Sequence, residues 1–204
     1  MLTTLLRQSA AGLRVLLVMT VLLGLAYPFA IYGLSRLPGL RHHAEGSLVE
    51  VNGKVVGSEL IGIDPVAAGG PDPYFHTRPS ASAPDVLGPG DPSVSGGSNL
   101  AGDSPTLRAT VTTRRELIAA RDGVFPPDVP PDAVTASASG VDPHISPAYA
   151  QLQVPRVARV TGLPQNTLRA LVAANTTGRS WGFLGAPGVN VLTLNVAVQR
   201  ARAG

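Results

Sequence analysis

An uncharged apolar run lies near the start of the sequence. Residues 15–34, VLLVMTVLLGLAYPFAIYGL, contain no charged side chain. A helix of that length, at about 1.5 Å per residue, crosses a hydrocarbon core of about 30 Å. We therefore expect a transmembrane helix over residues 15–34, preceded by a short N-terminal segment of residues 1–14. The alternative is a cleaved signal peptide, because Gly24-Leu25-Ala26 has the small-residue spacing of a cleavage site, but the apolar run continues past that point.

Two residues inside this run indicate a packing surface. Pro28 lies four residues after Gly24 and cannot donate a hydrogen bond to its carbonyl, so a kink is expected there. Gly24 also allows a second helix to approach closely. Gly24 and Pro28 are therefore candidate contacts with a partner helix, and the alternative is a lone anchor with a harmless kink.

The charges that flank the run bear on its orientation. Two arginines precede it and two follow it closely, so the positive-inside count is even. The free amino terminus favours a cytoplasmic N-terminus. The expected protein is therefore single-pass in the cell (inner) membrane, with its soluble domain on the outer face.

Beyond a juxtamembrane linker at residues 35–46, the pattern becomes that of a folded soluble domain, which we expect over residues 35–204. Residues 47–63, SLVEVNGKVVGSELIGI, predict a β-hairpin, because two β-rich runs flank Asn52-Gly53, the pair favoured in type I′ turns. Residues 64–104 are mostly Pro, Gly, Ser, Asp and Asn. A stretch that long without periodic structure is typical of a functional or docking loop.

Serine followed by proline begins two of the predicted helices, since serine caps a helix and proline fits its first turn. Glycine ends both of them, at positions 123 and 162. The expected helices are residues 105–121, residues 147–161 with Pro155 breaking or kinking the chain, and residues 164–175.

Two further segments predict strands. Residues 133–139, AVTASAS, fit a short strand of small side chains, and residues 189–198, VNVLTLNVAV, alternate apolar side chains on one face. That face holds Leu192, Leu194, Val196 and Val198. Strands thus stand before, between and after helices. The expected fold class is α/β or α+β, in which one N-terminal transmembrane helix precedes a single soluble domain with a small sheet and several helices.

Composition narrows the function classes. Only 14% of the residues are charged, against roughly a quarter in a typical soluble domain. The formal charge of +3 comes from scattered arginines, and only 4% of residues are aromatic, so nucleic-acid binding is disfavoured. There is no cysteine, which excludes a disulfide framework, a zinc–thiolate site and a cysteine nucleophile.

Spacing gives little support to a catalytic or metal site. The adjacent His42-His43 lack both a His-x-x-x-His spacing and a nearby carboxylate cluster. A membrane-anchored Ser-His-Asp hydrolase is an alternative, although no Gly-x-Ser-x-Gly motif is present. Its members would be Ser98, either His76 or His144, and Asp142. In VTASASGVDPHIS, residues 134–146, we expect Asp142 and His144 to hold a turn or to meet a partner.

Two loop motifs invite a binding interpretation. SGGSNLAGDSP, residues 95–105, resembles a phosphate-binding loop in placing Gly and Ser before a helix, but it lacks the Gly-Lys-Ser/Thr ending. YFHTRPSA, residues 74–81, gathers two aromatics, a histidine and an arginine, which are typical of interface hot spots. The equal alternative is that Tyr74 and Phe75 pin this loop to the core.

Five blocks of the sequence resemble the C subunit of the Kdp potassium-transporting ATPase, in that family's order. They are VNGKVVGSELIG, YFHTRPSA, SGGSNLAGDSP, VTASASGVDPHISPAYAQLQVPRVA and GFLGAPGVNVLTLN, and the preceding YPFAIYGL is similar too. The resemblance covers nearly the whole chain. The chain departs from the usual family pattern at Ile63, Thr77, Ala138, Gly188 and residues 101–104, without losing a reactive group.

The resemblance implies a non-catalytic subunit of a high-affinity, ATP-driven potassium uptake complex. Its partners would be a channel-like potassium-selecting subunit, a P-type ATPase subunit and a small peptide subunit. The family is described as a catalytic chaperone that raises the ATP affinity of the hydrolysing subunit, so ATP enters by resemblance only. No catalytic or metal-binding residue is expected, and the resemblance assigns no cofactor-binding residue either way. The partner-contact candidates are Gly24, Pro28, Tyr74, Phe75, His76, Arg78, Ser98, Asn99, Asp142 and His144.

Overall fold

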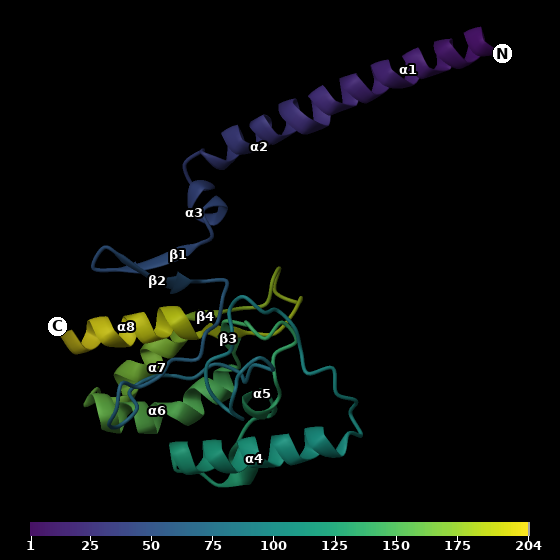
Figure 1. The fold of residues 1–204 in the computed structure, drawn as a ribbon. Coiled ribbons are helices and arrows are strands. Elements are labelled where there is room, and N and C mark those ends of the chain that lie inside the picture. Colours follow the sequence, from purple (N-terminus) through teal and green to yellow (C-terminus); the bar gives the residue numbers. More distant parts are fainter. Residues whose placement is uncertain (204) are drawn as a thin grey trace. The chain divides into compact units, whose positions relative to one another are not determined.

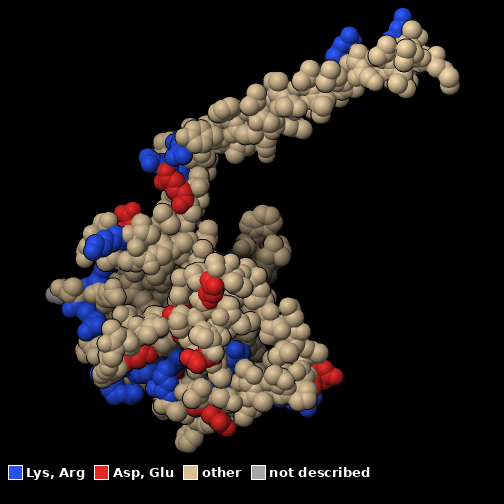
Figure 2. All heavy atoms as spheres, in the orientation of Figure 1, with Lys and Arg blue, Asp and Glu red and all other residues tan. Residues whose placement is uncertain are grey.

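The computed structural model describes residues 1–203 (Figure 1). The chain divides into two compact units, residues 1–47 and residues 48 onward. The first unit is built on one long helix, Leu2–Ser35, which alone among the described helices is long and apolar enough to cross a membrane. Charged side chains stand towards its two ends in Figure 2, and none lies between Arg14 and Arg36.

The long helix changes its winding just before Pro28. α1 (Leu2–Val21) passes into a π-helical turn, η1 (Leu22–Ala26), before α2 (Tyr27–Ser35) resumes the α-helical path. The N–H of Tyr27 bonds to the carbonyl of Leu22, one residue further back than in an α-helix. The disturbance expected at Gly24 and Pro28 takes the form of this wider turn.

Residues 36–47 follow the helix within the same unit and contain one short helix, α3 (Arg41–Ala44). Glu45 pairs with Arg36 and with Arg41, each at an N–O distance of 3.0 Å. All three side chains are largely exposed, so each pair adds little to stability.

The second unit opens with the predicted hairpin. β1 (Leu48–Val51) pairs antiparallel with β2 (Lys54–Ser58), and a bulge interrupts the register between Val49 and Glu50. Asn52 and Gly53 both have positive φ, at 53° and 74°, as a type I′ turn requires. The hairpin prediction is confirmed. Between residue 62 and α4 the described chain forms neither helix nor strand.

The predicted helix boundaries at Ser-Pro and Gly are confirmed. α4 (Pro105–Asp122) is capped by the hydroxyl of Ser104, and α6 (Pro147–Thr161) by the hydroxyl of Ser146. Gly123 and Gly162 end these helices in the left-handed conformation that glycine adopts without strain. Shorter elements stand between and after them. They are η2 (Pro126–Asp128), α5 (Pro131–Val134) and α7 (Gln165–Ala174).

A second small sheet lies among these helices. β3 (His144–Ile145), β5 (Gly188–Asn190) and β4 (Thr176–Thr177) pair antiparallel in that spatial order, and α8 (Val191–Ala203) follows β5 directly. The mixed α/β class with one long apolar helix is confirmed, with two small sheets in place of one within residues 1–203.

The predicted strand at residues 189–198 is wrong beyond its first two residues. The chain leaves β5 at Asn190, whose side-chain oxygen accepts the N–H of Thr193 at 3.1 Å and so starts α8. The alternating pattern predicted that Leu192 and Leu194 share one strand face. In the structure, Val191, Leu194 and Val198 are the deeply buried residues. Their spacing of three and four is that of one helix face.

The predicted strand at residues 133–139 is also wrong. The segment leaves α5 and continues as a loop in which serine side chains, rather than a neighbouring strand, satisfy the backbone. Ser137 Oγ accepts the N–H of Gly140 at 2.9 Å, and Ser139 Oγ accepts that of Val141 at 3.2 Å. Such local bonds compete with a β-ladder.

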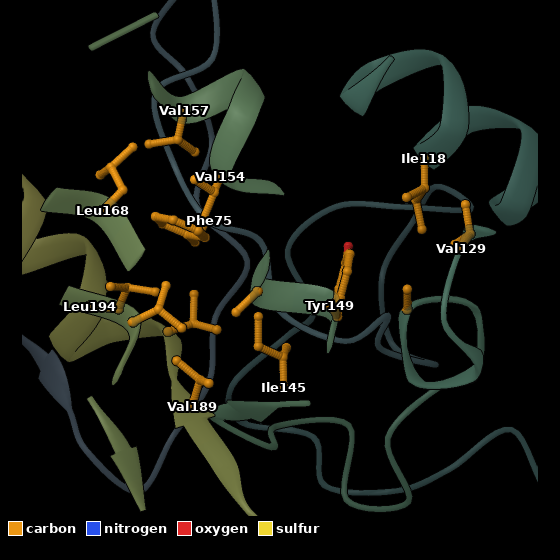
Figure 3. Packing of buried hydrophobic residues seen from close by; sticks show 14 of the residues in the cluster. Phe75, Ile118, Val129, Ile145, Tyr149, Val154, Val157, Leu168, Val189 and Leu194 are labelled. Atoms are coloured by element: carbon orange, nitrogen blue, oxygen red, sulfur yellow. The ribbon is translucent and has the colours of Figure 1, made fainter. Parts of the chain in front are cut away.

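Pro155 does not break α6, which runs continuously through it. The helix keeps its course because fully buried residues on both sides of the proline, Val154 and Val157, fix it to the core. The core draws on α4, α6, α7, α8 and the loop residue Phe75, whose ring lies beside Val154 in Figure 3.

Candidate functional site: a clamped polar loop

We call residues 72–78 the clamped loop. Its centre, Phe75 to Thr77, is buried, and its ends are half-buried. No partner strand pairs with it among the described residues. Asn195 of α8 accepts the N–H of Phe75 at 2.8 Å and donates to its carbonyl at 2.9 Å. Gln153 of α6 does the same for His76, at 2.8 and 3.3 Å. Each amide satisfies one backbone donor and one acceptor, as a neighbouring strand would.

Phe75 fixes the clamped loop from the apolar side. Its side chain is 0% exposed, and burial of a phenylalanine contributes about 2 kcal/mol. Of the two interpretations of the loop's aromatics, the geometry at this position therefore fits pinning to the core. Tyr74 next to it is half-buried.

His76 lies between two carboxylates. Its Nδ1 is 3.0 Å from Asp64 Oδ2, and its Nε2 contacts Asp72 Oδ2. Burial by itself would lower the pKa of His76, but the hydrogen bonds to Asp64 and Asp72 outweigh it and raise that pKa. Burial likewise opposes ionisation of Asp72, yet its bonds to His76 and to the N–H of Tyr74 lower its pKa to about 2. The protonated ring, which donates from both nitrogens, suits this position.

Thr77, which the resemblance marks as a departure from a usual glycine, bonds to Asp64 through both its backbone and its side chain. Its N–H donates to Asp64 Oδ1 at 2.8 Å, and its hydroxyl reaches the same oxygen at 3.1 Å. The hydroxyl adds a bond that glycine lacks, so this departure reinforces the hold on Asp64.

Arg156 supports the clamped loop from behind. Its guanidinium donates to the carbonyls of Asp72 at 2.8 Å and Tyr74 at 2.9 Å, and to the side chain of Gln153 at 3.0 Å. Its Nε donates to Asp122 Oδ1 at 2.6 Å, and that carboxylate is wholly buried. One cation therefore ties the loop to α4 and α6 together.

The same buried cluster continues to α4. Arg121 pairs with Asp122 at 2.9 Å and donates to the hydroxyl of Tyr149, also at 2.9 Å. Burial raises the pKa of Tyr149 to about 12, which keeps its hydroxyl protonated. These groups are occupied in holding two helices together, with no reactive atom left open.

Asp142 lies in the turn that leads into β3, which begins at His144. An ion pair with Arg78 links this turn to the clamped loop. Asp142 Oδ1 accepts the N–H of His144 at 2.9 Å, and Oδ2 pairs with Arg78 at 3.3 Å. Gly62 donates its N–H to the carbonyl of Val141 at 2.8 Å, next to this pair. Both residues thus hold the turn, which is one of the two roles expected of them.

A Ser-His-Asp arrangement is not assembled within residues 1–203. Ser98 and Asn99 are exposed, and neither His76 nor His144 has a serine hydroxyl as a hydrogen-bond partner in that part of the chain. Ser104, at the end of the glycine-rich segment, caps α4 through the N–H of Leu107 at 3.4 Å. Gly24 and Pro28 lie exposed on the long helix.

An apolar cavity of about 440 Å³ opens beside the clamped loop. The hairpin forms one wall, α8 another, and residues 61–66 a third, with Tyr74 between them. Ile63 is among its exposed apolar residues. Gly57 faces Leu192 closely here, because an added Cβ would lie 2.8 Å from Leu192 Cδ2 and would displace that side chain.

Sequence reasoning missed the residues that build the clamp. They are Asp64, Asp72, Gln153, Arg156 and Asn195. A usable signal was present in α8, where one asparagine interrupts an apolar run, and in α6, where Gln153 and Arg156 share a helix face with buried valines. A polar residue in such a position indicates a buried hydrogen-bond partner.

The raised pKa of His76 predicts how stability depends on pH. The protonated His76 ring stabilises the folded state. This contribution is complete below the pKa of about 6.5 that the ring has in the unfolded chain, and it is lost as the pH rises through the higher pKa of the folded chain. Asp72 behaves oppositely, losing its contribution as pH falls towards about 2. We expect the thermal midpoint to fall as pH rises above neutrality, and His76→Gln to remove that fall. Circular dichroism in detergent measures the thermal midpoint at each pH. The control is His42→Gln, which lies outside the second unit, and its midpoint should fall with pH as that of the parent does.

Comparison with known proteins places these features in a family context. A family model described as "K+-transporting ATPase, c chain" matches residues 9–200. The "Potassium-transporting ATPase KdpC subunit" of Kineococcus radiotolerans is 49% identical over 200 residues, which cover 98% of this chain and 97% of that protein. The subunit of that name from Bradyrhizobium diazoefficiens is 45% identical over 207 residues, covering 97% and 99%. That from Nitratidesulfovibrio vulgaris is 44% identical over 203 residues, covering 98% and 96%.

Proposed function

The chain belongs to the KdpC family, the c chains of K+-transporting ATPases, and we propose that its second unit is a non-catalytic cap on the outer face of the potassium-selecting partner subunit. As a member of this family it is an accessory subunit of a membrane-bound potassium-transporting ATPase. Hydrolysis of ATP then belongs to another subunit of the same assembly. The cap would stabilise that assembly from outside the membrane.

The observation that carries the proposal is the saturation of the clamped loop. Both ring nitrogens of His76 contact carboxylates, and the guanidinium of Arg156 is bonded at all three nitrogens. Because the His76 ring and the Arg156 guanidinium are fully hydrogen-bonded, they fix the conformation of the loop, and neither is free to act as a nucleophile or base. A rigid surface beside an apolar cavity suits docking on a partner better than chemistry.

The long helix supports a role inside the membrane as well. Small residues let transmembrane helices approach closely, and Gly24 lies in the π-turn ahead of Pro28. Pro28 also leaves the carbonyl of Gly24 without its normal helical donor. We propose that this segment packs against the helices of the partner subunits.

An effect on ATP affinity would be indirect under this proposal. A domain on the outer face is separated by the membrane from the site of hydrolysis. Coupling between distant sites typically amounts to about 1–3 kcal/mol, which changes an affinity by about 5- to 150-fold. The cap would supply such coupling by favouring one arrangement of the partner subunits.

Sidedness is the experiment that tests the proposal, and the absence of native cysteine makes it direct. Ser93 is exposed in the long loop of the second unit, and Gln8 is exposed before the apolar run. In the assembled complex, Ser93→Cys should react with a membrane-impermeant maleimide in intact cells. Gln8→Cys is the matched control and should react only after lysis.

The reverse labelling pattern would overturn the cap. Reaction of Ser93→Cys only after lysis, with Gln8→Cys reacting before it, would place the second unit in the cytoplasm. Direct action on the ATP-hydrolysing subunit would then be the better explanation for an effect on nucleotide affinity.

A further inference from the structure

The loop between β4 and β5, residues 178–187, exposes its apolar side chains. Trp181 is 86% exposed, Phe183 67% and Leu184 48%, all within four positions. Trp181 is the only tryptophan in the sequence. We call these three side chains the aromatic tip. The clamped loop and the cavity beside it do not use them, so their exposure needs a separate explanation.

The backbone holds the aromatic tip in a fixed form. Ser180 and Leu184 exchange backbone hydrogen bonds at 2.9 and 3.0 Å, and the N–H of Gly182 donates to the carbonyl of Arg179 at 3.1 Å. Trp181 has φ of +53°, which a bulky residue adopts only where its surroundings impose it. The base of the loop continues into β5, where Val189 is fully buried. Backbone hydrogen bonds therefore hold the tip, and the positive φ of Trp181 adds some conformational cost.

The same bonds satisfy several backbone groups of the loop, which lowers the cost of moving it into an apolar medium. Backbone groups that enter a lipid phase must be satisfied within the protein. In the tip, the N–H groups of Ser180, Gly182, Phe183 and Leu184 all have backbone partners. The guanidinium of Arg179 donates to the carbonyl of Gly185 at 2.8 Å and closes the loop at its base.

Charge along the chain favours an anionic surface. Residues 143–204 contain no Asp or Glu, and apart from the buried Arg156 they carry Arg159, Arg169, Arg179, Arg200 and Arg202. No carboxylate of this segment would repel an anionic lipid headgroup, and Arg179 stands next to the tip. Tryptophan prefers the boundary between headgroups and acyl chains, where its ring is buried and its N–H remains hydrated.

Chain connectivity leaves the membrane within reach of the second unit. Residues 36–47 join the end of the long helix to β1, so even a fully extended linker keeps Leu48 within about 40 Å of the end of the span. In Figure 1, β1 and the β4–β5 loop lie towards the same edge of the second unit.

We propose that the aromatic tip inserts Trp181, Phe183 and Leu184 into the headgroup–acyl boundary of the bilayer, as a second attachment of the chain beside its transmembrane helix. The occupant of this surface is thus phospholipid, preferably anionic. The inference requires only that the long helix spans the membrane, and it holds whichever partner subunit the cavity meets.

The single tryptophan makes the test specific. The full chain is reconstituted in vesicles of phosphatidylcholine and phosphatidylglycerol, with and without bromine on the acyl chains. Bromine quenches only tryptophan that lies among the lipids, so we expect the emission of Trp181 to be lower in brominated than in unbrominated vesicles. Vesicles without phosphatidylglycerol should give weaker quenching.

A relocated tryptophan provides the matched control. Phe125, ahead of η2, is 78% exposed on the same unit. The double variant Trp181→Phe, Phe125→Trp should show equal emission in the two kinds of vesicle. Equal emission from the native chain would overturn the inference. A second result would also overturn it. If Trp181→Ala lost its partner subunits in detergent, and Trp181 of the native chain were not quenched, the tip would dock on protein.

Discussion

Arg156→Met is expected to lower the free energy of unfolding of the second unit by about 3 kcal/mol, or roughly 10 °C in thermal midpoint. The substitution removes the donors to Asp122, to Gln153 and to the carbonyls of Asp72 and Tyr74 in one step. Asp122 would keep Arg121 but lose its shorter bond while wholly buried. Thermal unfolding followed by circular dichroism in detergent measures the loss.

A second arginine of α6 supplies the control for this experiment. Arg159 is exposed on the same helix, so Arg159→Met should change the free energy of unfolding by no more than about 0.5 kcal/mol. An equal loss in both variants would mean that helix α6, rather than the buried guanidinium, determines the effect.

Gly62→Ala is expected to destabilise the second unit by about 3 kcal/mol, through overpacking against backbone. A Cβ added at Gly62 would lie 2.2 Å from the carbonyl oxygen of Asp142 and 2.7 Å from the Cα of Pro143. Neither atom can move as a flexible side chain does. The turn held by Asp142 must therefore separate from residues 61–63, and the 2.8 Å bond from Gly62 to Val141 would be lost with it.

Gly102→Ala is the control for Gly62→Ala. A Cβ at Gly102 would meet nothing within 4 Å, and its φ is not in the left-handed region. Its thermal midpoint should match that of the parent. If Gly62→Ala also matched the parent, the close approach between residue 62 and the turn at residue 142 would not exist in solution.

Local chemistry made much of the fold predictable from sequence. Caps at Ser104 and Ser146, stops at Gly123 and Gly162, and the Asn52-Gly53 turn each depend on neighbouring residues alone, and all occur as expected. The segment after Asn190 failed because its apolar residues fit both a strand and a helix. Only the packing of Val191, Leu194 and Val198 against the core decides between them.

The candidate site was predictable only in its outline. The sequence indicated that the loop around His76 matters, since aromatic, basic and imidazole side chains gather there. It could not indicate what holds them, because the partners of Phe75 and His76 lie 120 and 77 residues away. Such pairings are set by tertiary packing and have no local signature.

Those distant pairings also constrain the order in which the chain can mature. Asn195 and Gln153 are both needed to satisfy the backbone of the clamped loop, and Asn195 lies near the very end of the sequence. On the ribosome, residues 72–78 therefore have no complete set of partners until residue 195, which lies 120 residues after Phe75, has been made. Closing such long loops slows folding. The long helix at the N-terminus thus enters the membrane well before the domain behind it can fold, and that domain stays open to chaperones and proteases until α8 emerges.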